Sequence, residues 1–107
     1  MFEEIRSHPR KIVRCPALVA LPNAPILRGR TVDVSLGGVS IMLPEQLRVG
    51  LQCKIALEPQ INGRGCRIVA SAKVVYSVLS CSDGFRIGFQ FTQLDAENNR
   101  TLATLMI

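Results

Sequence analysis

The sequence predicts an all-β domain in which about six strands close into a small antiparallel barrel, followed by one C-terminal helix. Short apolar runs alternate with turn-forming Pro, Gly and Asn residues along most of the chain. The chain contains four Phe, one Tyr and no Trp, so its core must be built mainly from Val, Ile and Leu, which suit strands. Closing the sheet removes exposed strand edges, which favours a barrel over an open sheet.

The length of the chain predicts a single domain. Its 107 residues lie near the usual domain size. Hydrophobic residues make up 48% of the sequence and charged residues 20%, proportions that exclude intrinsic disorder. Within the domain 1–107 we expect a flexible N-terminal arm over residues 1–14, the barrel over 15–92 and a capping helix over 95–107.

The first predicted strand covers residues 13–21 and is interrupted by Pro16. Because proline lacks a backbone N–H group, the interruption predicts an edge strand or a bent one. Two further prolines and Asn23 predict a turn over residues 22–25. The remaining predicted strands cover residues 27–35, 39–43, 51–57, 67–79 and 85–91.

Alternation between apolar and polar residues predicts which side chains face the core. We expect Val32 and Val34 inside, with Thr31, Asp33 and Ser35 on the outer face. The two long strands near the C-terminus alternate in the same way. Their predicted inward-facing residues are Ile68, Ala70, Ala72, Val74, Phe85, Ile87, Phe89 and Phe91.

Turn and cap signals separate the later elements. Asn62-Gly63 is typical of a type I′ hairpin turn, which requires positive φ at both central residues. Another turn is expected over residues 82–84. Asp95 is a candidate helix N-cap with an acidic residue in the first turn. Leu102, Leu105 and Met106 would then share one helix face and cover one end or side of the barrel.

The cysteine pattern argues against a metal site. Four cysteines are scattered without a C-x-x-C pair, and His8 is the single histidine. Cys15 and Cys53 lie in apolar runs and are expected in the core. The sequence has neither a secretory signal nor an apolar stretch long enough to cross a membrane. We therefore expect a cytoplasmic protein with reduced thiols and no membrane insertion.

Basic residues exceed acidic ones by 13 to 8, which gives a formal charge of +5. Four of them, Arg6, Arg10, Lys11 and Arg14, lie close together near the N-terminus. Such an excess attracts anions in general, whether nucleic acid, membrane or nucleotide. Apolar residues interrupt this basic run, so it does not have the pattern of a simple basic tail.

Arg10 and Arg14 form an R-x-x-x-R pair just before the first predicted strand. Pro9 and the β-branched Ile12 and Val13 favour an extended chain, in which the two arginines would lie about 13 Å apart on the same side. Arginine offers a planar fork to phosphates and to guanine edges. The pair therefore suits an anionic nucleotide.

Asp33, Ser35 and Gly38 form a D-x-S-x-x-G motif where a strand runs into a Gly-Gly turn. The two polar side chains project from one outward face. They lie beside a backbone that a ligand can approach closely, because glycine carries no side chain. Two interpretations stay open: recognition of a nucleotide base, or local hydrogen bonds that cap the turn.

Together, Arg10-x-x-x-Arg14 and Asp33-x-Ser35-x-x-Gly38 resemble the signature of the PilZ domain, the bacterial receptor module for cyclic di-GMP. The resemblance covers nearly the whole chain. It implies a six-stranded antiparallel barrel with a flexible arm that wraps the ligand. The arginines would contact guanine edges and phosphates, and Asp33 and Ser35 would meet a guanine from the barrel side. Gly38 would permit close backbone approach.

Further candidates come from this comparison and from the place of Tyr76 near the end of the long predicted strand. His8 and Pro9 stand where many members carry additional arginines, and Arg6 and Lys11 are candidates to replace them. Tyr76 is either a stacking platform for a guanine or a half-buried strand aromatic. The additional candidate ligand residues are thus Arg6, Lys11, Gly37 and Tyr76.

The leading functional hypothesis is a non-catalytic cyclic di-GMP receptor that orders its arm and signals to an unidentified downstream protein, in motility, biofilm or exopolysaccharide control. Catalytic equipment is missing from the sequence, because it has no second histidine, no paired carboxylates near the signature and no phosphate-binding G-x-x-x-x-G-K loop. We expect no cofactor and no DNA partner, and a homo-oligomer is compatible with the sequence. The alternatives are a PilZ-like adaptor without nucleotide, or a small barrel that binds single-stranded nucleic acid.

Overall fold

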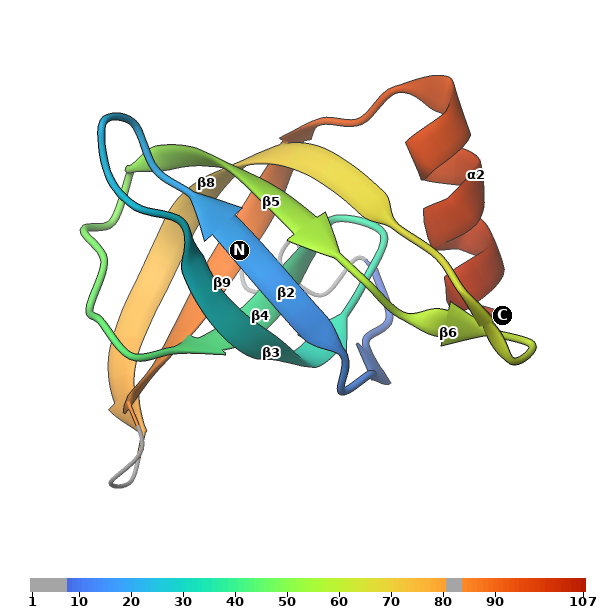
Figure 1. Ribbon diagram of the computed structural model, residues 1–107, viewed down its shortest axis with the longest axis horizontal. Coiled ribbons are helices and arrows are strands. Elements are labelled where there is room, and N and C mark those ends of the chain that lie inside the picture. The colour runs from blue at the N-terminus through green and yellow to red at the C-terminus, as the bar shows by residue number, and fades with distance from the viewer. Residues whose placement is uncertain (1–7, 81–83) are drawn as a thin grey trace.

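A computed structural model describes residues 8–80 and 84–107 of the chain and shows a closed six-stranded barrel with one helix beside it (Figure 1). The barrel strands follow each other around the barrel in the order β2-β3-β4-β9-β8-β5, and β5 pairs back to β2. All neighbouring pairs are antiparallel, which confirms the predicted fold class. The elements are β2 Pro16–Ala20, β3 Leu27–Val34, β4 Gly38–Leu43, β5 Gln52–Leu57, β8 Ile68–Ser80, β9 Gly84–Gln93 and α2 Ala96–Leu105.

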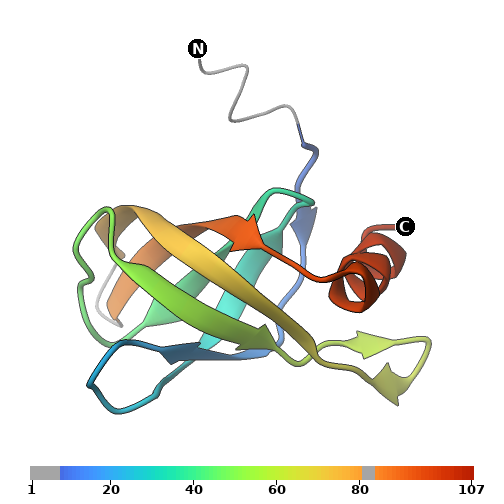
Figure 2. The ribbon, with the colours of Figure 1, turned by 90° about the horizontal axis from the view of Figure 1, so that it is seen from above.

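Three short strands lie outside the six strands of the barrel. β1, Lys11–Ile12, pairs with the C-terminal end of β3. β6, Gln60–Ile61, and β7, Arg64–Gly65, form a separate hairpin that projects below the helix in Figure 2. The turn of this hairpin has φ values of 53° at Asn62 and 79° at Gly63, so the predicted positive φ at both positions is confirmed.

Alternating side chains of the strands fill the barrel interior. The predicted inward positions of β8 and the central positions of β9 are buried, namely Ile68, Ala70, Ala72, Val74, Ile87 and Phe89. Phe85 and Phe91 pack against this core from its margins. Cys15 and Cys53 are also buried, as predicted. Burial raises the pKa of the Cys53 thiol to about 11, which keeps it protonated and inert.

Pro16 does not mark an edge strand. β2 pairs with β3 on one side and with β5 on the other, so the edge-strand prediction is wrong. Proline is tolerated because Pro16 is the first residue of its strand. The chain is instead interrupted before this residue, between β1 and β2. Backbone hydrogen bonds from Val13 to Val32 and from Thr31 to Cys15 keep the interrupted stretch alongside β3.

The predicted alternation fails in the middle of β3. The pairing of β3 with β4 shifts register between Thr31 and Asp33, which is a β-bulge. Thr31 is therefore only 1% exposed, while Val32 is half-buried, the reverse of the prediction for both residues. The Thr31 hydroxyl accepts a hydrogen bond from the Cys15 N–H and donates one to the Val13 carbonyl, which satisfies its buried polar group.

The C-terminal helix α2 begins as predicted. The Asp95 carboxylate accepts a hydrogen bond from the Asn98 N–H at 2.8 Å, and this bond lowers the pKa of Asp95. Leu102 and Leu105 are buried, and Met106 packs against the same core. The helix lies against one side of the barrel beside β8 (Figure 2). The predicted capping role of α2 is thereby confirmed.

Two predicted features fall partly outside the described residues. The turn expected over residues 82–84 includes two residues that the structure does not describe, and β9 begins at Gly84. Of the predicted arm, residues 1–7 are likewise outside the described part, and residues 11–12 form β1. Within residues 8–80 and 84–107, no helix has the length and apolar character needed to span a membrane.

Candidate functional site

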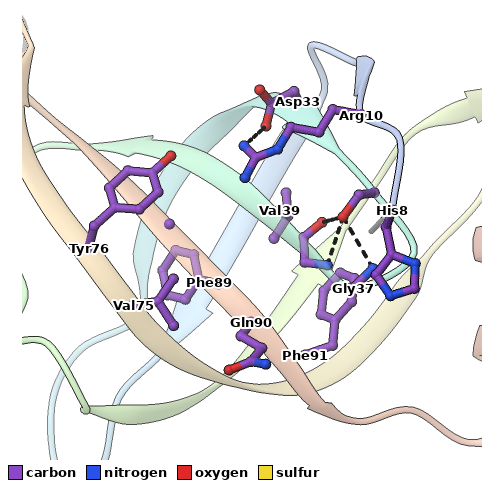
Figure 3. A pocket seen from close by; sticks show the side chains of 13 residues that line it. His8, Arg10, Asp33, Gly37, Val39, Val75, Tyr76, Phe89, Gln90 and Phe91 are labelled. Atoms are coloured by element: carbon purple, nitrogen blue, oxygen red, sulfur yellow. Dashed lines mark hydrogen bonds and ion pairs between the residues drawn. The ribbon is translucent and has the colours of Figure 1, made fainter. Parts of the chain in front are cut away.

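An open pocket of about 550 Å³ lies on the outer face of the barrel (Figure 3). Its walls come from the segment before β1, from the β3–β4 turn, and from β8 and β9. The lining residues are His8, Arg10, Asp33, Ser35, Gly37, Gly38, Val39, Val75, Tyr76, Gly88, Phe89, Gln90 and Phe91. Residues from both sequence motifs thus meet in one place.

Strand register explains why these residues converge. Asp33 of β3 is paired with Ser40 of β4, Ser40 with Gly88 of β9, and Gly88 with Tyr76 of β8. Directly paired residues of neighbouring antiparallel strands point to the same face. The four positions therefore form one row across the outside of the barrel, with Asp33 and Tyr76 at its two ends.

The Asp33 carboxylate is the centre of a polar network. Its Oδ1 accepts a hydrogen bond from the Ser40 hydroxyl at 2.8 Å and lies 3.4 Å from Nη1 of Arg10. Its Oδ2 accepts from Nη2 of Arg86 at 3.0 Å. The Asp33 side chain is 14% exposed, against 44% for Arg10 and 37% for Arg86. Two arginines thus compensate one largely buried carboxylate.

Ser35 has a local role in the turn. Its hydroxyl accepts hydrogen bonds from the N–H groups of Gly37 and Gly38, each at 3.1 Å. The Ser35 N–H donates to the Gly38 carbonyl at 2.8 Å, which closes the hairpin between β3 and β4. Ser35 therefore makes the local hydrogen bonds that cap the turn, while its contact with a ligand stays a prediction. Asp33, in contrast, contacts groups on other strands.

Gly38 is required by the packing of the barrel. A Cβ atom at this position would lie 2.2 Å from the carbonyl oxygen of Phe89 in β9, a distance that no real side chain tolerates. At Gly37 a Cβ atom would instead meet the His8 ring at 2.7 Å. At Gly38 the added atom would collide with backbone, which cannot move away, whereas at Gly37 it would meet a side chain that can move. Of the two glycines, Gly38 is the one that the fold itself demands.

Tyr76 forms the wall of the pocket that faces Arg10 across the opening (Figure 3). Its ring lies over Gly88, where an added Cβ would come within 2.1 Å of the ring carbon Cε2. The ring is half-buried and still lines the pocket. The two interpretations of Tyr76 are therefore compatible, because one ring can pack on its strand and offer a face to a ligand.

The sequence matches the family model of the PilZ domain over residues 4–107. The chain belongs to the PilZ domain family. It is 33% identical over 101 residues to the catalytic subunit of a UDP-forming cellulose synthase from Xanthomonas axonopodis pv. citri (strain 306). That match covers 92% of this chain and 13% of the relative, so this chain spans only a small part of the length of that protein.

Solved structures show the same fold as this PilZ domain. The motility inhibitor MotI/DgrA of Bacillus subtilis superposes with a TM-score of 0.80 at 14% identity, over 94% of this chain and 48% of that one. The PilZ domain of YcgR from Escherichia coli, solved with c-di-GMP, superposes with a TM-score of 0.68 at 19% identity. That match covers 92% of this chain and 86% of the YcgR domain. At such identities the likeness establishes the architecture alone.

The two arginines of the PilZ signature lie in different places. Arg10 lines the pocket, whereas Arg14 lines a second hollow of about 450 Å³ together with Arg28 and Arg30. Nη2 of Arg30 donates to the Arg14 carbonyl at 3.3 Å. The extended-chain prediction placed Arg10 and Arg14 on one side. The alternation does not continue between them, because the pairing with β3 shifts by one residue between β1 and β2.

The remaining basic candidates contribute differently. The Lys11 ammonium donates to the carbonyls of Leu105 and Ile107, both at 2.9 Å. It therefore satisfies carbonyls at the C-terminal end of α2, where a cation is favoured by the helix dipole. In this arrangement Lys11 points to the helix rather than into the pocket. Arg6 lies outside the described residues.

Sequence reasoning missed Arg86, His8 and Gln90. Arg86 occupies an outward position of β9, a place where a charged residue is normally just solvated. Its partner Asp33 is 53 residues away in the chain, so no local pattern connects them. From the sequence, His8 was only a departure from the family pattern. In the structure its ring packs on Gly37 at the pocket rim.

The chemistry of the lining suits a planar polar anion. It offers the Arg10 guanidinium, the Asp33 carboxylate, two hydroxyl groups and several aromatic rings within a single pocket. The residues that the structure describes contain no group of three His, Cys, Asp or Glu side chains able to hold a metal ion.

Replacing Gly38 by Ala tests its packing role. We expect Gly38→Ala to lower the free energy of unfolding of the ligand-free protein by about 1–3 kcal/mol, because the new methyl group collides with the β9 backbone. Urea unfolding measures this loss.

Gly65→Ala is the matched control, since a Cβ there meets nothing within 4 Å. Its effect should stay within about 0.5 kcal/mol. Equal unfolding free energies for the two variants would contradict the packing role of Gly38.

Proposed function

We propose that this PilZ domain is a non-catalytic receptor for cyclic di-GMP, which binds in the pocket lined by Arg10, Asp33, Ser35 and Gly38. The observation that carries the proposal is the convergence of Arg10 with the D-x-S-x-x-G motif in one open pocket, where Arg10 lies 3.4 Å from Asp33. The YcgR PilZ domain, which shares this architecture, was solved with that dinucleotide.

The lining groups match the chemistry of a guanine dinucleotide. A guanine edge presents O6 and N7 as acceptors, which an arginine fork can bind together. Its ring N–H and amino groups are donors for a carboxylate such as Asp33. Tyr76 offers a flat face for stacking a base. The phosphates carry negative charge that a basic domain attracts.

Arg14 enters this proposal through a conformational change. It lines the second hollow and no part of the pocket. We expect the ligand to draw the segment around Arg14 toward a phosphate and to order the N-terminal arm, residues 1–14. The ordered arm would present a new surface to a downstream protein. Regulation of motility or exopolysaccharide synthesis through that protein is part of the proposal.

The first test is calorimetric titration with cyclic di-GMP. Arg10→Ala and Arg14→Ala should each weaken binding by about 1.5–3 kcal/mol, because each removes charge-assisted contacts to the ligand. Arg10→Lys should also lose affinity, since an ammonium cannot reproduce the planar fork. Ligand-free thermal stability should hardly change.

Arg48→Ala is the control for loss of positive charge alone. This exposed loop residue lines neither the pocket nor the second hollow. It should bind like the parent. An Arg14→Ala protein with parental affinity would remove Arg14 from the site. A parent that does not bind cyclic di-GMP would refute the receptor function and favour a PilZ-like adaptor without nucleotide.

Comparison with cyclic di-AMP tests guanine recognition. Adenine presents an amino donor where guanine presents the O6 acceptor, so an arginine fork loses its match. We expect clearly weaker binding of cyclic di-AMP in the same titration. Because both ligands carry the same phosphates, equal affinities would point to a nonspecific basic surface.

Hydrogen exchange tests the ordering of the arm. On saturation with cyclic di-GMP, amides of the arm and of residues 33–38 should gain protection, because the ligand holds these segments together. β5 serves as an internal control, since it lines no part of the pocket and its inward residues are buried in the core, so its exchange should not change. An arm with unchanged exchange in a saturated sample would rule this switch out.

A further inference from the structure

Arg86 lies next to the proposed ligand site but is not part of the pocket lining. It projects from β9 and donates from Nη2 to Oδ2 of Asp33 at 3.0 Å. This contact is part-buried, and it is shorter than the 3.4 Å contact of Arg10 with the other carboxylate oxygen. Asp33 is thus held from behind by Arg86 and from the pocket side by Arg10.

Hydrogen bonding around Arg86 is incomplete. Its Nε is buried and has no hydrogen-bond partner within residues 8–80 and 84–107. A guanidinium normally binds a carboxylate through two parallel N–H groups, one to each oxygen. Here Oδ1 is taken by Ser40 at 2.8 Å and shared with Arg10. Asp33 therefore meets Arg86 through one bond only, and a buried donor without a partner is unfavourable.

We propose that Arg86 is a positioning residue that makes the Arg10–Asp33 contact exchangeable. When Arg10 leaves Asp33 for a ligand, the carboxylate keeps Arg86 as its counter-charge and can turn Oδ1 toward the unpartnered Nε. This gain offsets the loss of the Arg10 contact. Without Arg86, Arg10 becomes the only cation among residues 8–80 and 84–107 that pairs with this carboxylate, which is 14% exposed, and it is retained there. The inference rests on the proposed receptor function.

The test uses Arg86→Gln, which keeps a donor of similar reach but removes the charge. We expect its affinity for cyclic di-GMP in calorimetry to fall about tenfold. Arg67→Gln is the matched control, because Arg67 also binds a carboxylate, Glu58 at 2.9 Å, and lines no part of the pocket. It should bind like the parent. Parental affinity of Arg86→Gln would overturn the inference.

A double-mutant cycle separates the proposed mechanism from an independent effect. If Arg86 acts by releasing Arg10, then adding Arg86→Gln to Arg10→Ala should weaken binding much less than it does in the parent. If the affinity of the double variant falls by the product of the two single-variant factors, the mechanism is overturned. If Arg86→Gln does not fold, judged by circular dichroism, Arg86→Lys takes its place in both titrations. It retains the counter-charge but offers no second N–H of a planar fork, so a loss smaller than tenfold is expected, and parental affinity would overturn the role of Nε.

A ligand-free measurement keeps this inference distinct from the receptor function. NMR relaxation of the arginine Nε–H groups reports the mobility of each guanidinium. We expect the Arg10 guanidinium to be less mobile in Arg86→Gln than in the parent, because Asp33 then holds it alone. Unchanged mobility would overturn the inference even if cyclic di-GMP binds. Failure of the parent to bind cyclic di-GMP would refute the receptor function but leave this result standing.

Discussion

The approach of β4 to β9 at Gly38 is the constraint on which the pocket depends. With 2.2 Å between a notional Cβ and the Phe89 carbonyl, only glycine allows the two strands to pair there. Their pairing places Ser40 beside Gly88, and the bare backbone of Gly88 in turn leaves room for the Tyr76 ring. Gly38 of the motif is thus required for packing of the barrel whether or not a ligand binds. Under the proposed function, the same residue therefore serves both closure of the barrel and binding.

Period-two alternation predicted the fold well wherever strands are regular. In β8 and β9 each expected inward residue, from Ile68 to Phe89, is buried or packs at the core margin. The prediction failed at Thr31 because of a bulge. The position of a bulge depends on how β3 pairs with its neighbours, and this pairing cannot be predicted from the sequence of one strand alone. The edge-strand prediction at Pro16 failed for a related reason. The missing N–H of a proline weakens a sheet only where a neighbouring strand would accept a hydrogen bond from that position.

The site was predictable in part. Asp33, Ser35 and Gly38 are close in sequence, so their short motif identified one side of the pocket. Arg86 was not predictable, since its contact with Asp33 joins residues that only the closed barrel brings together. The expectation that Arg14 lies on the same side as Arg10 differs from the structure. Residues four apart lie on the same face only while the strand is regular. The chain is interrupted between β1 and β2, and the Arg14 side chain lines a separate hollow.

The geometry of Asp33 suits a site that must exchange one partner for another. In the Arg10–Asp33 pair, at 3.4 Å, the guanidinium is 44% exposed and screened by solvent, so the pair contributes about 1 kcal/mol or less. A charge-assisted hydrogen bond to a bound anion contributes about 1.5–3 kcal/mol, so under the proposed function Arg10 gains by moving to the ligand. Asp33 itself stays compensated by Arg86 and Ser40. Under the proposed function, the carboxylate therefore keeps its place without competing strongly against the nucleotide for Arg10.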